Sequence, residues 1–149
     1  MASRRFAIDT NLYVDALRTE TGKVALDAFH AAFAPFVHLS AVVVQELRAG
    51  ARDRAAATLD ANIIAPFERR DRVFAPSYAA WKESGRVLAE LVNPKDWRSV
   101  TRSFVNDTLL AMSCRESGVV LVTSNTTDFG RIAAVREFDF VSPWHAPAA

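Results

Sequence analysis

The stretch Phe6-Ala7-Ile8-Asp9-Thr10-Asn11 decides the fold of this chain. Its apolar residues end abruptly at a carboxylate and two small polar residues, a pattern typical of a buried strand whose carboxyl end opens into a site. In open α/β sheets, ligands bind just beyond the carboxyl ends of the strands. We therefore expect Asp9 to lie at the centre of any functional site.

Further strand candidates alternate with helical segments along the chain. Residues 119–123 form a continuous, β-branched apolar run, typical of a strand buried on both faces. Strands separated by helices of ten or more residues pair in parallel through right-handed crossovers. The sequence therefore predicts the α/β class, as a three-layer α/β/α sandwich with a mostly parallel central sheet.

The boundaries of the other elements follow from capping residues, prolines and glycines. We expect strands at residues 36–40 and 138–141, the latter at an edge, and either a strand or a connector at 72–75. Helices are expected at residues 11–17, 21–33, 41–50, 53–64, 78–91 and from about 100 or 103 to 116, with Pro66 ending the fourth and Gly118 following the last. Residues 95–102 are predicted as a loop, and residues 124–130 as a polar turn before a short helix.

Length and composition favour a single domain, residues 1–149, because half of the 149 residues are apolar and can form a sizeable core. A net charge of +1 argues against a protein that coats nucleic acid by charge alone, so any nucleic-acid contact must be local. The one cysteine excludes an intramolecular disulfide, and the three histidines lack zinc-ligand spacing. No stretch resembles a signal peptide or a bilayer span, and we expect a soluble, cytoplasmic protein.

Two acids share a helix face with apolar residues. Asp107 follows Phe104 by three positions and precedes Ala111 by four, and Glu46 follows Val43 and Val42 at helical spacing. A buried carboxylate must be protonated, paired with a cation or bound to a metal. We therefore expect both acids to face the interior or the rim of a cleft.

Each acid also has a purely structural explanation when it is taken alone. Asp9 can cap the turn that follows it, Asp107 can serve the first turn of its helix, and Glu46 can pair with an arginine. Asp128 follows Thr126 and lies where it can cap a helix. The coincidence of four acids at strand ends and on inward faces is better explained by one shared cation.

Oxygen ligands without Cys or His select Mg²⁺, with Mn²⁺ as a second possibility. A metal held by acidic residues can orient a water as the nucleophile and neutralise charge on a phosphate. The acids therefore favour hydrolysis of a phosphodiester.

The chain resembles the PIN-domain nucleases, and more narrowly the VapC-like toxin ribonucleases of bacterial toxin–antitoxin pairs. The similarity covers nearly the whole chain and rests on four pieces in order: Ile8-Asp9-Thr10-Asn11, Glu46-Leu47-Arg48-Ala49-Gly50, Asn106-Asp107-Thr108 and residues 123–129, Thr-Ser-Asn-Thr-Thr-Asp-Phe. The resemblance implies a magnesium-dependent endoribonuclease that is held in check by a small antitoxin and usually forms a homodimer.

The resemblance also implies roles for individual residues. Asp9, Glu46 and Asp107 would bind the metal, and Asp128 would be a fourth, more variable acid of the catalytic set. Hydrogen bonds from supporting polar residues would hold the acids in place; these residues are Thr10 or Asn11, and Asn125.

One position departs from the family pattern, because Thr127 stands where many members carry an arginine before the last acid. This departure puts the local phosphate contacts in doubt. Lys95, Arg98 and Arg102 are the alternative candidates for holding the RNA backbone, although each is also explained as a solvated loop residue.

Other functions compete with the nuclease hypothesis. An aspartyl-phosphate phosphatase needs a second aspartate two residues after Asp9, where Asn11 stands, and a receiver domain needs a lysine after a late strand, which residues 123–125 lack. A non-catalytic PIN-like module that binds RNA or protein remains the main alternative.

Overall fold

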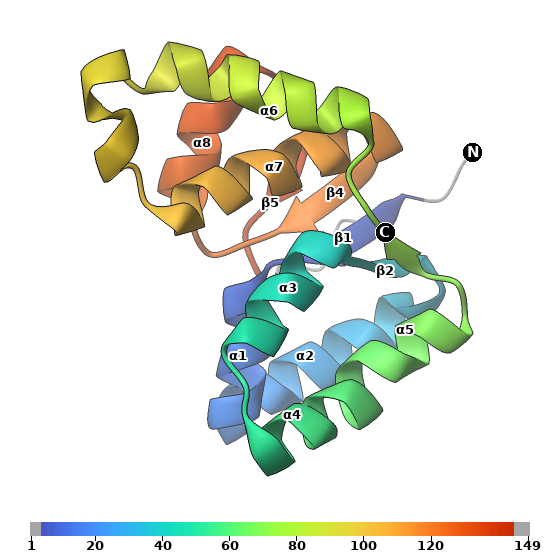
Figure 1. Cartoon of the computed structure of the whole chain (residues 1–149). Coiled ribbons are helices and arrows are strands. Elements are labelled where there is room, and N and C mark those ends of the chain that lie inside the picture. The colour runs from blue at the N-terminus through green and yellow to red at the C-terminus, as the bar shows by residue number, and fades with distance from the viewer. Residues whose placement is uncertain (1–3, 145–149) are drawn as a thin grey trace.

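The computed structural model describes residues 4–144, in which short strands alternate with helices (Figure 1). The strands are β1 (Arg5–Ile8), β2 (Val37–Ser40), β3 (Val73–Phe74), β4 (Val119–Val122) and β5 (Phe140–Val141). The helices are α1 (Thr10–Arg18), α2 (Glu20–Phe33), α3 (Ala41–Ala49), α4 (Asp53–Leu59), α5 (Ala65–Arg69), α6 (Tyr78–Leu91), α7 (Arg102–Ser117) and α8 (Thr126–Val135), with short turns η1 (Ala34–Phe36), η2 (Asp60–Ile64) and η3 (Pro94–Ser99).

The sheet has the strand order β3-β2-β1-β4-β5, and every neighbouring pair is parallel. Strand β1 is therefore central, and its carboxyl end, from which Asp9 follows, lies between those of β2 and β4. Strand β5 lies at an edge as predicted, and residues 73–74 prove to be a strand rather than a connector. The predicted α/β class and parallel sheet are confirmed.

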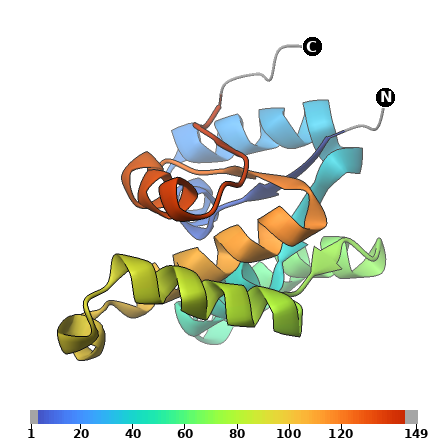
Figure 2. The ribbon, with the colours of Figure 1, turned by 90° about the horizontal axis from the view of Figure 1, so that it is seen from above.

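Helices cover both faces of the sheet. Figure 2 shows α2 and α7 on opposite sides of the strands, with α6 outside α7. On the α2 side, the rings of Phe6 and Phe29 meet edge to face with centroids 5.6 Å apart. On the other side, α7 is almost continuously buried from Phe104 to Cys114, and Gly118 ends it in the left-handed conformation at φ 65°. The predicted three-layer arrangement is thus the one observed.

Three local predictions were wrong. The helix from Asp53 does not end at Pro66: the α-helical hydrogen bonding changes to the π-helical turn η2, and a new α-helical segment, α5, starts with Pro66 in its first turn, where a proline is tolerated. The expected loop over residues 95–102 is largely the 3₁₀ turn η3. Helix α8 begins at Thr126, inside the stretch predicted as a turn, because the side chain of Asn125 caps it.

No helix within residues 4–144 is long and apolar enough to cross a membrane.

Candidate active site

Asp9 is buried directly after β1, with 4% of its surface exposed. Its carboxylate accepts two short hydrogen bonds, from the Thr10 backbone N–H at 2.8 Å and from the Thr123 hydroxyl at 2.7 Å. Burial raises the pKa of Asp9, although both hydrogen bonds act in the opposite direction, and the negative charge of Glu46 raises it further. Asp9 thus does cap α1 with one carboxylate oxygen. Its other oxygen accepts the bond from Thr123, which follows β4, and this contact has no part in capping the helix.

Glu46 reaches the same site from α3. The Thr10 hydroxyl donates a hydrogen bond of 2.8 Å to Glu46 Oε1, which joins the first turn of α1 to α3. Glu46 is partly buried, and no arginine within residues 4–144 forms an ion pair with it; the nearby Arg48 instead lies 3.5 Å from Asp60. The structural alternative of a Glu46–arginine pair therefore does not account for this acid.

Asp107 faces the interior, as the helical spacing predicted. It lies in the second turn of α7 with only 6% of its surface exposed, so it does not serve the first turn. Burial is the main effect that raises the pKa of Asp107 to about 7, and the negative charges of Asp9, Glu46 and Asp128 add to it. The four predicted acids are therefore close enough for their charges to repel one another.

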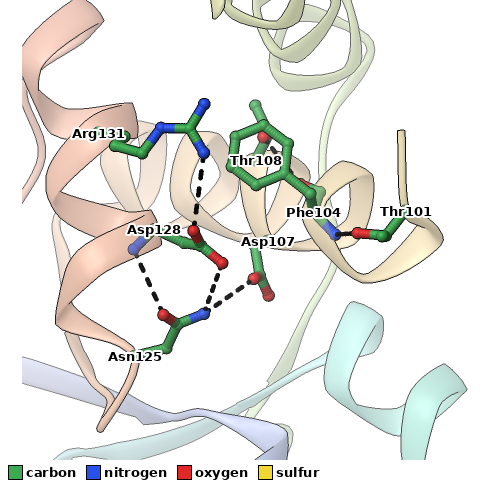
Figure 3. Close-up of polar contacts among 7 residues, drawn as sticks. All are labelled: Thr101, Phe104, Asp107, Thr108, Asn125, Asp128 and Arg131. Atoms are coloured by element: carbon green, nitrogen blue, oxygen red, sulfur yellow. Dashed lines mark hydrogen bonds and ion pairs between the residues drawn. The ribbon is translucent and has the colours of Figure 1, made fainter. Parts of the chain in front are cut away.

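Asn125 connects two of the acids (Figure 3). Its Nδ2 donates to Asp128 Oδ2 at 3.1 Å and, at a longer 3.5 Å, to Asp107 Oδ2. Its Oδ1 accepts the Asp128 backbone N–H at 3.3 Å, so the same side chain caps α8. The cap residue of this helix is thus Asn125, and the side chain of Asp128 is left facing the site.

The remaining predicted residues separate into two groups. Arg102, at the start of α7, lines a groove that also contains Glu46. Lys95 and Arg98 lie on η3 with exposed side chains and do not line that groove. Asn11 is exposed on α1, and among the described residues its side chain contacts none of the acids by a hydrogen bond.

Two residues at the site were not among those predicted from the sequence. Thr123 is fully buried; its hydroxyl donates to Asp9 and accepts the Asn125 backbone N–H at 3.0 Å. Arg131 places its guanidinium 3.8 Å from Asp128 and 5.0 Å from the centre of the Phe104 ring (Figure 3). A polar residue ending an apolar strand could have indicated Thr123, and a basic residue one turn after Asp128 could have indicated Arg131.

The donor set suits a hard cation. The site offers carboxylate oxygens supported by hydroxyl and amide groups, which is the chemistry that Mg²⁺ and Mn²⁺ prefer. Within residues 4–144 no basic side chain pairs with Asp9, Glu46 or Asp107, and Asp128 has only the 3.8 Å contact to Arg131. In the described residues no three of the acids are close enough to share one ion as they stand. Binding of a shared cation would therefore require the carboxylates, which repel one another without metal, to move closer together.

We expect Thr123→Val to weaken the site without removing any acid. Valine keeps the shape of threonine but leaves Asp9 Oδ2 and the Asn125 N–H without a partner, so the free energy of unfolding should fall by about 1–3 kcal/mol. The apparent affinity for Mg²⁺ or Mn²⁺ should fall by about 10- to 100-fold, because the acid is no longer oriented. Thermal unfolding at increasing metal concentration measures both quantities.

The matched control for that variant is Thr127→Val, an exposed threonine in the same segment. Its free energy of unfolding should change by no more than about 0.5 kcal/mol. Equal metal affinity in Thr123→Val and the wild type would show that the Thr123 hydroxyl does not orient Asp9.

A family model described as the PIN domain matches residues 6–135 of the chain. No curated protein matches it. Among solved structures, the DNA-bound VapBC of Salmonella typhimurium is similar with a TM-score of 0.66 and 21% identity, over 94% of this chain and 98% of that one.

Two further solved structures share the same fold. VapBC2 from Rickettsia felis, bound to a promoter DNA fragment, has a TM-score of 0.63 and 20% identity over 93% of this chain and 98% of that one. FitAcB from Neisseria gonorrhoeae has a TM-score of 0.63 and 19% identity, over 94% of this chain and 99% of that one.

Proposed function

Because the chain belongs to the PIN-domain family, as its sequence resemblance predicted, we propose that it is a metal-dependent endoribonuclease that hydrolyses RNA phosphodiesters. The observation that carries the proposal is the group of four acids near the carboxyl ends of the parallel strands, in which Asp9 and Asp107 are buried and Asn125 joins Asp107 to Asp128. A folded chain keeps such a group at a cost to its stability, and sites of this kind are where a fold binds charged ligands.

We assign Asp9, Glu46 and Asp107 as the metal-holding acids and Asp128 as the fourth member of the set. When bound there, Mg²⁺ or Mn²⁺ would supply a polarised water and offset the charge of the scissile phosphate. Thr10 and Thr123 each fix one acid by a hydrogen bond, at Glu46 and Asp9 respectively.

The protein groups set the protonation state of the site. Asp107, whose pKa is raised to about 7, holds its proton in the absence of a cation at pH values where an ordinary aspartate has lost it. A nearby positive charge favours the ionised form of a carboxyl group and so lowers its pKa. The Asn125 amide Nδ2 donates to both Asp107 and Asp128, and it therefore limits how far these two acids can separate.

We further propose a toxin–antitoxin role, with a small antitoxin as partner and a homodimer as the assembly. The support is the similarity in fold to VapBC and FitAcB structures. A partner that places an arginine or lysine among the acids would offset their charge and compete with the cation. Size-exclusion chromatography with light scattering tests the dimer, and co-expression with the product of a neighbouring gene tests the partner.

The alternative is a non-catalytic PIN-like module that binds RNA or protein. Cleavage of a structured RNA pool by the partner-free protein in Mg²⁺, Mn²⁺ and chelator separates the two functions, with Glu46→Gln purified in parallel to detect a contaminating ribonuclease. We expect cleavage that needs metal and is lost in the variant. Binding of the pool without cleavage would favour the alternative.

A further inference from the structure

A groove of about 670 Å³ is lined by Glu46 and by other residues of α3, the segment after it and the start of α7. Its walls carry polar groups from both elements, and two arginines stand in it. The lining residues used below are Glu46, Arg52, Arg102, Ser103 and Asn106. The groove thus contains one acid of the candidate active site together with two arginines.

The two arginines are placed to meet an anion. Arg52 is held in position because its Nη1 donates to the carbonyl oxygens of Ala49 at 2.9 Å and Ala51 at 3.0 Å. Arg102 is exposed at the first position of α7, and neither arginine forms an ion pair with an acid within residues 4–144. Their positive charge is therefore available to a ligand that enters the groove.

A third arginine lies on the other side of the acids. Arg131 belongs to α8, which follows β4, whereas the groove adjoins α3, which follows β2. Strand β1, which leads to Asp9, separates these two strands in the sheet. The Phe104 ring supports the guanidinium of Arg131, and its contact with Asp128 is long and half exposed, so it contributes little energy and leaves N–H donors free (Figure 3).

We propose that the backbone of the RNA substrate crosses the acids from the Arg52–Arg102 groove to Arg131. This path rests on the proposed nuclease function and names the residues that hold the phosphates on each side of the bond to be cut. Guanidinium groups suit this task because their donors match phosphate oxygens in pairs. The central acids, which would repel an RNA strand by themselves, are then flanked by positive charge on both sides.

The test measures binding separately from cleavage. Fluorescence anisotropy with a labelled 12-nucleotide single-stranded RNA, in chelator to prevent cutting, gives Kd for Arg102→Ala, Arg52→Ala and Arg131→Ala at several salt concentrations. We expect each variant to bind about 3- to 10-fold more weakly and to lower the slope of log Kd against log salt by about 0.7. The loss should be the same for a second RNA sequence, because phosphate contacts carry no sequence information.

The control is Arg69→Ala, which removes the same charge from the end of α5. Because β3 begins shortly after Arg69, this residue lies toward the amino ends of the strands, away from the acids. Its Kd and salt slope should equal those of the wild type. Losses of the same size in Arg69→Ala and in the three variants would overturn the path, since they would report net charge only. Unchanged binding in Arg102→Ala and Arg131→Ala would overturn it as well.

Cleavage assays keep this proposal distinct from the nuclease proposal. A wild type that binds RNA through these arginines but does not cut it would support the path and refute the nuclease. A wild type that cuts RNA while all three variants cut with unchanged KM would support the nuclease and refute the path. We expect a higher KM in the variants with a smaller change in kcat.

Discussion

Replacing Asp9 by asparagine is expected to lower RNA cleavage by at least about 1,000-fold, equivalent to roughly 4 kcal/mol of lost transition-state stabilisation. Asp9 is the most central acid, since it follows the middle strand and is held on both oxygens by hydrogen bonds. An amide has nearly the same shape, but it lacks the negative charge that a divalent cation requires. The loss should therefore appear in kcat at saturating RNA rather than in the affinity for RNA.

The measurement is the initial cleavage rate in saturating Mg²⁺ or Mn²⁺, with circular dichroism to verify the fold. Asp15→Asn is the matched control, because Asp15 is an exposed aspartate on α1 and undergoes the same chemical change outside the site. It should cut within about twofold of the wild type. An Asp9→Asn variant that is folded and retains a tenth of the wild-type rate would exclude Asp9 as an essential acid.

The sequence was informative where a local pattern strongly favours one type of secondary structure or one side-chain direction. The short apolar run before Asp9 and the β-branched run 119–122 favoured buried strands by their length and composition, and parallel pairing then places their carboxyl ends at one edge. The helical spacing of Phe104, Asp107 and Ala111 fixed the direction of that acid because side chains three and four residues apart share a face.

Features that depend on contacts between distant segments were beyond the sequence. The hydrogen bond between Thr123 and Asp9 joins residues 114 positions apart, and the register of β1 against β4 creates it. Arg131 resembles any surface arginine until α7 brings the Phe104 ring against it. The π-helical turn at residues 60–64, which carries the chain past Pro66, has no simple signal in the order of residues.

The acids also couple function to stability. The pKa of Asp107 is raised from 3.8 to about 7 in the folded chain, so between these values the folded state binds a proton that the unfolded state has lost. The stability contributed by this group is therefore full at low pH, falls as pH rises from about 4 to about 7, and stays lost above that. The full shift corresponds to on the order of 4 kcal/mol, an upper bound because the protein can relax around the charge.

Asp107→Asn is thus expected to stabilise the metal-free protein at pH 8, by about 1–4 kcal/mol, while abolishing cleavage. The asparagine can still accept the Asn125 hydrogen bond, and it carries no charge that burial would penalise or the other acids would repel. Denaturant unfolding in chelator at pH 5 and pH 8 measures the effect: the wild type should lose more stability over this interval than the variant.

Divalent metal should make the wild type more stable than Asp107→Asn, the reverse of the order expected in chelator. Mg²⁺ or Mn²⁺ stabilises whichever protein binds it, by about 4.1 kcal/mol at 1,000 times Kd, and we expect this gain in the wild type but not in Asp107→Asn. Asp15→Asn, the exposed change on α1 used above, should follow the wild type in every condition. Equal stability of wild type and Asp107→Asn at pH 8 in chelator would mean that neither burial nor the other acids make the Asp107 charge costly in the folded protein, and it would remove the physical reason for a cation at this site.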